Sequence, residues 1–146
     1  MIGLLQRVAR AHVKVDGKTI ASIERGLLVL IGVERNDGHA QADRLLERLI
    51  SYRVFPDESG RMNFGLRDTS GGLLLVPQFT LAADTNKGTR ASFTPAADPE
   101  HSEILFDYLV AMARQNHPDT ASGIFGENMQ VGLVNDGPVT FLLEAR

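Results

Sequence analysis

The sequence of 146 residues contains no cysteine, which excludes disulfide bonds, thiolate metal sites and cysteine nucleophiles. It also lacks a long hydrophobic run, because the apolar stretches 26–33 and 72–76 fall far short of the roughly 18 residues that a membrane helix needs. Arg7 stands too early for the apolar core of a signal peptide. We therefore expect a cytoplasmic protein without a membrane partner.

Positive charge is scarce in the second half of the chain. Residues 1–73 hold eleven Lys and Arg against nine Asp and Glu, whereas residues 74–146 hold four against nine. The net charge of −3 argues against a protein that coats nucleic acid. Arginine outnumbers lysine twelve to three, which favours planar contacts with phosphate. These features favour a small basic patch for a nucleic-acid end over a long basic groove.

Length and composition indicate one globular domain, residues 1–146. Alternating polar and apolar residues along 2–15 predict a half-buried strand. The apolar runs 27–33 and 72–81 predict buried strands, the second interrupted by Pro77. Turn-forming residues predict a hairpin at Asp16-Gly17-Lys18 and loops at 55–70 and 82–97.

Two helices are indicated by apolar residues at helical spacing. Asp37 is the expected N-cap of the first helix and Asp98 that of the second, where Pro99 takes the first helical position. The two apolar faces consist of Ala42, Leu45, Leu46, Leu49 and Ile50, and of Ile104, Leu105, Tyr108, Leu109 and Met112. With about seven strands, the pattern predicts an α+β fold in which two helices cover curved, barrel-like β-sheets.

The segment Asn135-Asp136-Gly137-Pro138 separates two predicted strands, 129–134 and 139–143. All four residues are common in turns, which suits a hairpin. A proline is unfavourable, however, where the next strand needs its amide hydrogens, and a Gly-Pro bond is of the kind that can be cis. The residues leave two interpretations open, a hairpin turn or a functional element.

The usual catalytic motifs are missing. The chain has no G-x-S-x-G elbow, phosphate-binding loop, H-E-x-x-H pair or Rossmann glycine pattern. Its four histidines lie on different predicted elements, without metal-ligand spacing, and we interpret them as surface or packing residues: His12, His39, His101 and His117. No metal or cofactor is expected, and an enzyme built on this chain would work without a conventional general base.

The segment "VPQFTL" contains polar residues where a buried strand should end. Pro77 removes a donor from the strand ladder, so the chain should bend away from its neighbour here. Gln78, the Phe79 amide and the Thr80 hydroxyl would then lie at the mouth of a sheet. The alternative is an ordinary strand end whose polar residues face water.

Four stretches together make the chain similar to the D-aminoacyl-tRNA deacylase family: "MIGLLQRVARAHVKVDG", "MNFG", "PQFTLAADTNKGTRASF" and "FGENMQVGLVNDGPVTF". The similarity runs from Met1 to about Phe141. It rests on a Ser-Gln-Phe-Thr-type motif, here Pro77 to Thr80, and on an Asn-x-Gly-Pro-x-Thr motif, here Asn135 to Thr140. The resemblance implies hydrolysis of the ester between a D-amino acid and the terminal adenosine of tRNA.

The resemblance also implies a homodimer, and it favours a functional element over a hairpin turn at Asn135 to Pro138. The Gly137-Pro138 bond would be cis, and this motif would reach into the partner subunit's active site. The carbonyls of Gly137 and Pro138 would lie against the substrate's α-carbon and reject an L side chain by steric clash. Glycyl-tRNA, including Gly-tRNA(Ala), would be hydrolysed as well, because glycine has no side chain to reject.

Several other residues acquire expected roles through the resemblance. The Phe79 amide would stabilise the oxyanion and Gln78 would shape the pocket. Thr80 is expected to position the substrate rather than to act as nucleophile, because no base adjoins it and the 2′-hydroxyl of the tRNA can assist the water. Phe125 and Met129 would line the pocket for the adenosine. Arg7 would brace the Gly-Pro segment.

This chain departs from the family pattern at two positions. Pro77 stands where the family has serine, so a hydroxyl and an amide hydrogen are missing from the motif. Ala91 replaces the family's proline after the arginine of "KGTR", which leaves that loop less constrained. Two other readings remain: a non-catalytic nucleic-acid-binding dimer, which the net charge disfavours, and a general esterase, which would hydrolyse small esters without adenosine.

Overall fold

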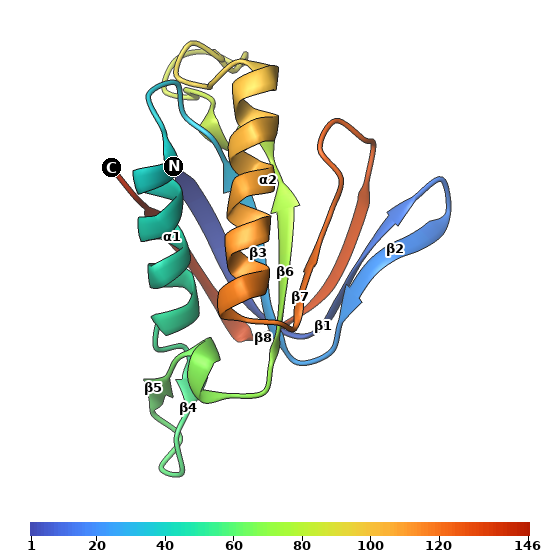
Figure 1. The fold of residues 1–146 in the computed structure, drawn as a ribbon, viewed down its shortest axis with the longest axis vertical. Coiled ribbons are helices and arrows are strands. Elements are labelled where there is room, and N and C mark those ends of the chain that lie inside the picture. The colour runs from blue at the N-terminus through green and yellow to red at the C-terminus, as the bar shows by residue number, and fades with distance from the viewer.

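The computed structural model describes all residues 1–146 and contains eight strands, two α-helices and two short 3-10 helices. The elements are β1 (Ile2–Val15), β2 (Lys18–Ile23), β3 (Gly26–Gly32), α1 (His39–Ser51), β4 (Phe55–Pro56), β5 (Met62–Phe64), η1 (Leu66–Asp68), β6 (Gly72–Pro77), η2 (Phe79–Ala82), α2 (Pro99–Asn116), β7 (Thr120–Ser122) and β8 (Gln130–Glu144). Figure 1 shows α1 and α2 side by side across one face of a twisted sheet. The prediction of an α+β domain with curved, barrel-like sheets and two helices is confirmed.

The central strand of the six-stranded sheet is β1, with which three other strands pair. The first half of β1 pairs antiparallel with β3 and the second half with β2, while β8 covers the other edge along most of its length. β6 pairs parallel with β3, and β7 pairs parallel with β6. The parallel strands β3, β6 and β7 therefore end at the same side of the sheet, where the loops that follow β6 and β7 meet.

The strands β3 and β6 are buried on both faces, which explains their uninterrupted apolar runs. On β3, Leu27 and Val29 pack toward the helices, whereas Leu28 packs on the opposite face. The larger core lies between the sheet and the helices, where α1 contributes Leu45 and Leu49. The smaller core lies among β1, β2, β6 and the start of β8, where the sheet curls.

The helix starts agree with the sequence prediction at α2 and differ at α1. Asp98 caps α2, since its carboxylate accepts a hydrogen bond from the His101 amide at 3.0 Å. The prediction that Asp37 caps α1 is wrong, because the cap residue is Gly38, whose amide donates to Oε1 of Gln41 at 2.9 Å. Asp37 is buried and contacts other groups, described below. Neither helix has the length and apolar character that a membrane span requires.

The segment 55–70, predicted as a loop, contains β4, β5 and η1, so the prediction is wrong there. Asp57 organises the connection between the two strands. Hydrogen bonds from the Ser59 hydroxyl and from the Asn63 side chain lower the pKa of Asp57 to about 2. Periodicity could not reveal strands this short, since β4 has two residues and β5 has three.

A single strand, β8, occupies the place where the sequence predicts two strands joined at 135–138. Both ends of β8 pair antiparallel with β1, so no hairpin reverses the chain between them. Asn135 and Thr140 face β1 residues that are only two positions apart, which leaves residues 136–139 opposite a single residue of β1. The predicted strand pair is therefore wrong, because these four residues form a bulge in one long strand.

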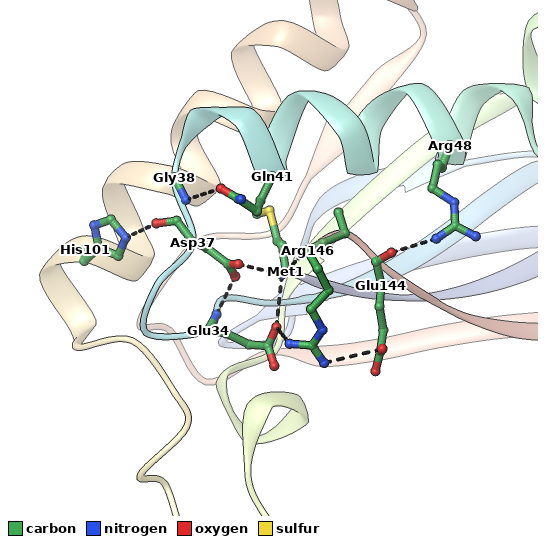
Figure 2. Close-up of polar contacts among 10 residues, drawn as sticks. Met1, Glu34, Asp37, Gly38, Gln41, Arg48, His101, Glu144 and Arg146 are labelled. Carbon is green, nitrogen blue, oxygen red and sulfur yellow. Dashed lines mark hydrogen bonds and ion pairs between the residues drawn. The ribbon is translucent and has the colours of Figure 1, made fainter.

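A polar network joins Met1, which precedes β1, to the segment between β3 and α1 and to the end of the chain (Figure 2). The Met1 ammonium is buried and donates to Asp37 at 2.7 Å and to Glu34 at 3.1 Å. Arg146 also contacts Glu34, and the His101 ring contacts the Asp37 carbonyl at 2.6 Å. Partial burial alone would raise the pKa of Glu34, but the hydrogen bonds from Arg146 and Met1 outweigh it and hold this pKa below its ordinary value.

Replacing Glu34 with glutamine should reveal a pH-dependent contribution to stability. A carboxyl group whose pKa is lowered by folding stabilises the fold above its unfolded pKa, and that contribution is lost as the pH falls through the folded pKa. Glu34→Gln should lower the free energy of unfolding at pH 7 by about 1.5–3 kcal/mol. The difference from the wild type should shrink below about pH 4.5. Urea unfolding at pH 7 and pH 3 measures both values, and an equal difference at the two would contradict the prediction.

Candidate active site

The segments 77–80 and 125–129 line one open pocket of about 450 Å³. The first segment follows β6 and the second lies beyond β7, so the parallel pairing of these strands brings them to the same end of the sheet. The predicted pocket residues that meet here are Pro77, Gln78, Phe79, Thr80, Phe125 and Met129. A second hollow of about 460 Å³, lined by residues of 22–25, 69–71 and Asp119, contains none of them.

Gln78 marks the change from β6 to the 3-10 helix η2. Its amide donates to the Ile31 carbonyl of β3 at 2.7 Å, and its carbonyl accepts from the Leu81 amide at 3.2 Å. Phe79 and Thr80 are the first residues of η2, so their amides have no hydrogen-bond acceptor within this 3-10 helix. The Phe79 amide is therefore a candidate donor toward the pocket.

The side chains of Gln78 and Thr80 contact each other at the pocket. Nε2 of Gln78 donates to Oγ1 of Thr80 at 2.6 Å, with Thr80 exposed and Gln78 half-buried. No carboxylate or imidazole is bonded to the Thr80 hydroxyl, and a carboxamide cannot accept its proton at neutral pH. The site thus offers a hydroxyl and a carboxamide for orientation rather than an activated nucleophile.

A close approach at Gly123 brings two walls of the pocket together. A Cβ atom at this position would lie 2.7 Å from Sδ of Met129 and 3.3 Å from Cδ of Pro77. The buried Gly123 amide donates to the Leu75 carbonyl at 2.8 Å, which anchors the chain just after β7. Phe125 is half-buried and packs against the larger core. Glycine at 123 therefore sets how near Met129 lies to the β6 side of the pocket.

Gly137 and Pro138 are exposed in the bulge of β8, and the peptide bond between them is cis. Arg7 lies beneath the bulge with a side chain that is 12% exposed. Its Nε donates to the Asp136 carbonyl at 3.0 Å and its Nη1 to the Val54 carbonyl at 2.7 Å. Neither Gly137 nor Pro138 lines the pocket of its own chain.

Asn135 holds the same bulge from within. Its Nδ2 donates to the carbonyls of Arg7 at 2.9 Å and Val139 at 3.0 Å, and Oδ1 accepts from the Thr140 hydroxyl at 3.4 Å. The sequence predicts for Asn135 only a place in a turn or motif. The tendency of Asn side chains to bond nearby backbone is a usable signal, but the bond to Arg7 depends on strand pairing across 128 residues.

None of the four histidines lines the pocket. Their contacts are those of His12 with Gly132, His39 with Tyr108, His101 with the Asp37 carbonyl and His117 with the Gly71 carbonyl. No group of three or more histidine, aspartate or glutamate side chains gathers where it could hold a metal ion. The pocket lining contains one ionisable side chain, Glu127, and its other side chains offer only hydrogen bonding and apolar contact.

An aromatic contact beside the pocket was missed by sequence reasoning. The rings of Phe79 and Phe93 stack with their centroids 4.9 Å apart and their planes at 21°. Phe79 lines the pocket, and Phe93 comes from the segment between η2 and α2. Nothing in the sequence spacing predicts this contact, because the chain between the two rings has no regular secondary structure beyond η2.

Comparisons with known proteins identify the family. Residues 4–144 match the family model described as D-Tyr-tRNA(Tyr) deacylase. The D-aminoacyl-tRNA deacylase of Thioalkalivibrio sulfidiphilus is 64% identical over 144 residues, which cover 99% of this chain and 97% of that protein.

Two solved structures share the fold. The c-Myc DNA Unwinding Element Binding Protein has a TM-score of 0.96 and 35% identity, over 100% of this chain and 99% of its own. A probable eukaryotic D-amino acid tRNA deacylase has a TM-score of 0.86 and 17% identity, over 98% of each chain. The second likeness concerns the fold alone.

The fold and pocket define a small α+β protein with an open pocket at the end of the parallel strands β6 and β7. The family match spans nearly the whole chain and identifies which enzyme family has this fold and pocket. The chain belongs to the D-aminoacyl-tRNA deacylase family and is an enzyme that hydrolyses the ester bond between a D-amino acid and tRNA.

Replacing Gly123 with alanine should alter the pocket. The new methyl group would force the Met129 sulfur, 2.7 Å away, to move, whereas the backbone conformation at this position tolerates alanine. We expect KM for D-Tyr-tRNA to rise about three- to tenfold with little change in kcat, because the change affects binding equally in ground and transition states. Steady-state kinetics test this, with thermal unfolding as the control for folding. An unchanged KM would show that Met129 does not contact the substrate.

Proposed function

We propose that the pocket formed by the segments 77–80 and 125–129 binds the aminoacyl-adenosine end of tRNA and catalyses hydrolysis of its ester. The observation that carries the proposal is the meeting of these two segments in one pocket of about 450 Å³. Phe125 and Met129 offer apolar surface for the adenosine, and Pro77 extends that surface. Because aminoacyl-tRNA is made and used in the cytoplasm, we propose that the enzyme works there.

An ester needs only modest catalytic help, because it is more reactive than an amide. Water attacks the carbonyl carbon, the carbonyl oxygen becomes an oxyanion, and the bond to the ribose oxygen breaks to release the amino acid and tRNA. We assign oxyanion stabilisation to the Phe79 amide, which stands at the start of η2. Gln78 shapes the pocket around the ester. The neighbouring 2′-hydroxyl of the adenosine assists the water in place of a protein base.

Thr80 has a positioning role in this mechanism. A hydroxyl nucleophile needs a group that accepts its proton. The side chain bonded to Thr80 is the carboxamide of Gln78, at 2.6 Å, which is no base. This contact supports a hydroxyl that is oriented to bind substrate or water.

We further propose that Gly137 and Pro138 of one subunit reach the pocket of the other subunit in a homodimer. Three observations support this: the two residues are exposed, they are absent from their own chain's pocket, and the bulge is braced by Arg7 and Asn135. Two carbonyls held against the substrate's α-carbon would admit a hydrogen but clash with an L side chain. Bracing suits this role, because a mobile bulge would yield to that side chain.

Glycine is a substrate that such a gate admits. Its α-carbon carries a second hydrogen where an L amino acid carries its side chain, so the two carbonyls meet no obstruction. We therefore propose that the enzyme also hydrolyses glycyl-tRNA, including tRNA(Ala) mischarged with glycine.

DNA binding is the second candidate function, because the neighbour with 35% identity is named as a DNA unwinding element binding protein. The net charge of −3 disfavours binding to long nucleic acid. Selective release of D-tyrosine from D-Tyr-tRNA, with L-Tyr-tRNA left intact, separates the two functions.

Thr80→Ala should keep most of the deacylase activity. A lost positioning contact corresponds to about 1 kcal/mol, which is about tenfold or less in kcat/KM. Thr80→Ser should behave like the wild type. Single-turnover rates on D-Tyr-tRNA measure the effect, and a loss of about a thousandfold or more in the folded alanine variant would restore threonine as the nucleophile.

Gly137→Ala should impair chiral discrimination. The φ of Gly137 is +136°, where L residues are strained, and a Cβ atom would lie 2.7 Å from Cγ2 of Val139. The bulge must therefore shift, and a shift of about 1 Å changes rates by up to about a hundredfold. We expect the ratio of D-Tyr-tRNA to L-Tyr-tRNA hydrolysis to fall by about tenfold or more. Gly60→Ala is the matched control, because Gly60 also has a positive φ, +83°, but lies in the β4–β5 connection with no neighbour within 4 Å.

Mixed dimers test whether the bulge acts across the subunit boundary. Gln78→Ala alters the pocket, whereas Gly137→Ala alters the bulge, so each homodimer has two defective sites. If the bulge serves the partner's pocket, a heterodimer of the two variants has one site with a normal pocket and a normal bulge. Mixing the variants should then restore discriminating activity to about a quarter of all sites. No gain on mixing, with heterodimers verified by mass, would contradict the cross-subunit arrangement.

A further inference from the structure

Phe79 and Phe93 form an exposed aromatic pair beside the pocket. Their side chains are 40% and 43% exposed, although stacking covers one face of each ring. Two exposed phenylalanine rings in contact form an apolar patch in water, and such patches often mark a binding surface. Phe79 also lies between Gln78 and Thr80, so the pair continues directly from the proposed catalytic segment.

The position of Phe93 is held by the backbone. Asp84 and Ser92 exchange two hydrogen bonds, from the Asp84 amide at 2.8 Å and from the Ser92 amide at 2.9 Å. This antiparallel bridge closes the loop 85–91 at its base and places Phe93 one residue beyond the closure. Phe93 is therefore presented against Phe79 by a closed loop rather than by a free segment.

The loop 85–91 is basic in an acidic half of the chain. It carries Lys87 and Arg90, which are two of the four Lys and Arg residues in 74–146, and it contains no acidic residue. Both side chains are exposed, and neither takes part in an ion pair. Two unpaired cations in the loop that leads directly into an exposed aromatic pair match the chemistry of single-stranded nucleic acid, which presents a ring and a phosphate at every step.

We propose that the Phe79–Phe93 pair stacks on the nucleotide that precedes the terminal adenosine of the tRNA, while Lys87 and Arg90 contact the phosphates of that single-stranded end. This inference rests on the proposed placement of the adenosine between the two pocket segments. Phe79 then has two separate functions, because its amide faces the ester while its ring faces the RNA. The pair grips any base, since every base has a face on which an aromatic ring can stack.

Two analogues in which an amide replaces the ester test the proposal. One is adenosine carrying D-tyrosine on its 3′ position, and the other is the same nucleoside preceded by two cytidines. The wild type should bind the longer analogue at least about tenfold more tightly than the nucleoside. In Phe93→Ala this advantage should largely disappear, while the affinity for the nucleoside analogue stays unchanged. Phe93→Tyr, which keeps the ring, should retain the advantage.

The two cations are tested by salt dependence. For the longer analogue, the slope of log Kd against log salt concentration should fall by about 0.7 for each cation removed in Lys87→Gln and Arg90→Gln. The slope for the nucleoside analogue should stay the same in these variants. Equal slopes in wild type and variants would overturn the assignment of the two side chains.

Three results would overturn the stacking role. The first is that the longer analogue binds no more tightly than the nucleoside, and the second is that Phe93→Ala leaves its advantage intact. Equal weakening of both analogues in Phe93→Ala would assign the pair to packing within the protein or between subunits instead. Failure of the wild type to bind either analogue would overturn the pocket assignment itself, and this inference with it, and is thereby distinguishable from a failure of stacking alone.

Discussion

The antiparallel pairing of β1 with β8 is the interaction on which the rest of the structure depends. It joins the first strand to the last and leaves β1 with no free edge, so the central strand is fixed on both sides. Because pairing resumes on either side of residues 136–139, these residues must project from the sheet. Arg7 of β1 and Asn135 of β8 then brace the projection from two directions. Sheet pairing and these two side chains together thus turn four residues into a braced external element.

The proposed chemistry relies on main-chain groups. The Phe79 amide and the carbonyls of Gly137 and Pro138 have no side-chain pKa, and their directions follow from η2 and from the bulge. A tRNA ester suits such a site, because it is activated already and brings its own hydroxyl. This explains why an enzyme can lack every familiar catalytic triad or metal motif. In this proposal, the specificity for D-amino acids comes from the fixed positions of the backbone groups in η2 and in the bulge.

Much of the fold and part of the site could be predicted from sequence because they depend on local patterns. Apolar periodicity indicated both helices, Asp98 with Pro99 marked the start of α2, and a proline inside an apolar run pointed to the segment 77–80. The features that were missed depend on contacts between distant segments. Asp37 contacts the start of β1 instead of capping α1, and the bulge exists only because β8 pairs with a strand more than a hundred residues earlier.

Because of the bulge, the number of residues between Asn135 and Thr140 can vary without a change in the register between β1 and β8. The ladders on its two sides are each fixed by their own hydrogen bonds with β1, so neither depends on how many residues lie between Asn135 and Thr140. Adding or removing a residue there would change the reach of the protrusion by up to about 3.3 Å while the same side chains of β1 and β8 still face one another. The length of the bulge can therefore change in evolution while the sheet and the core stay the same.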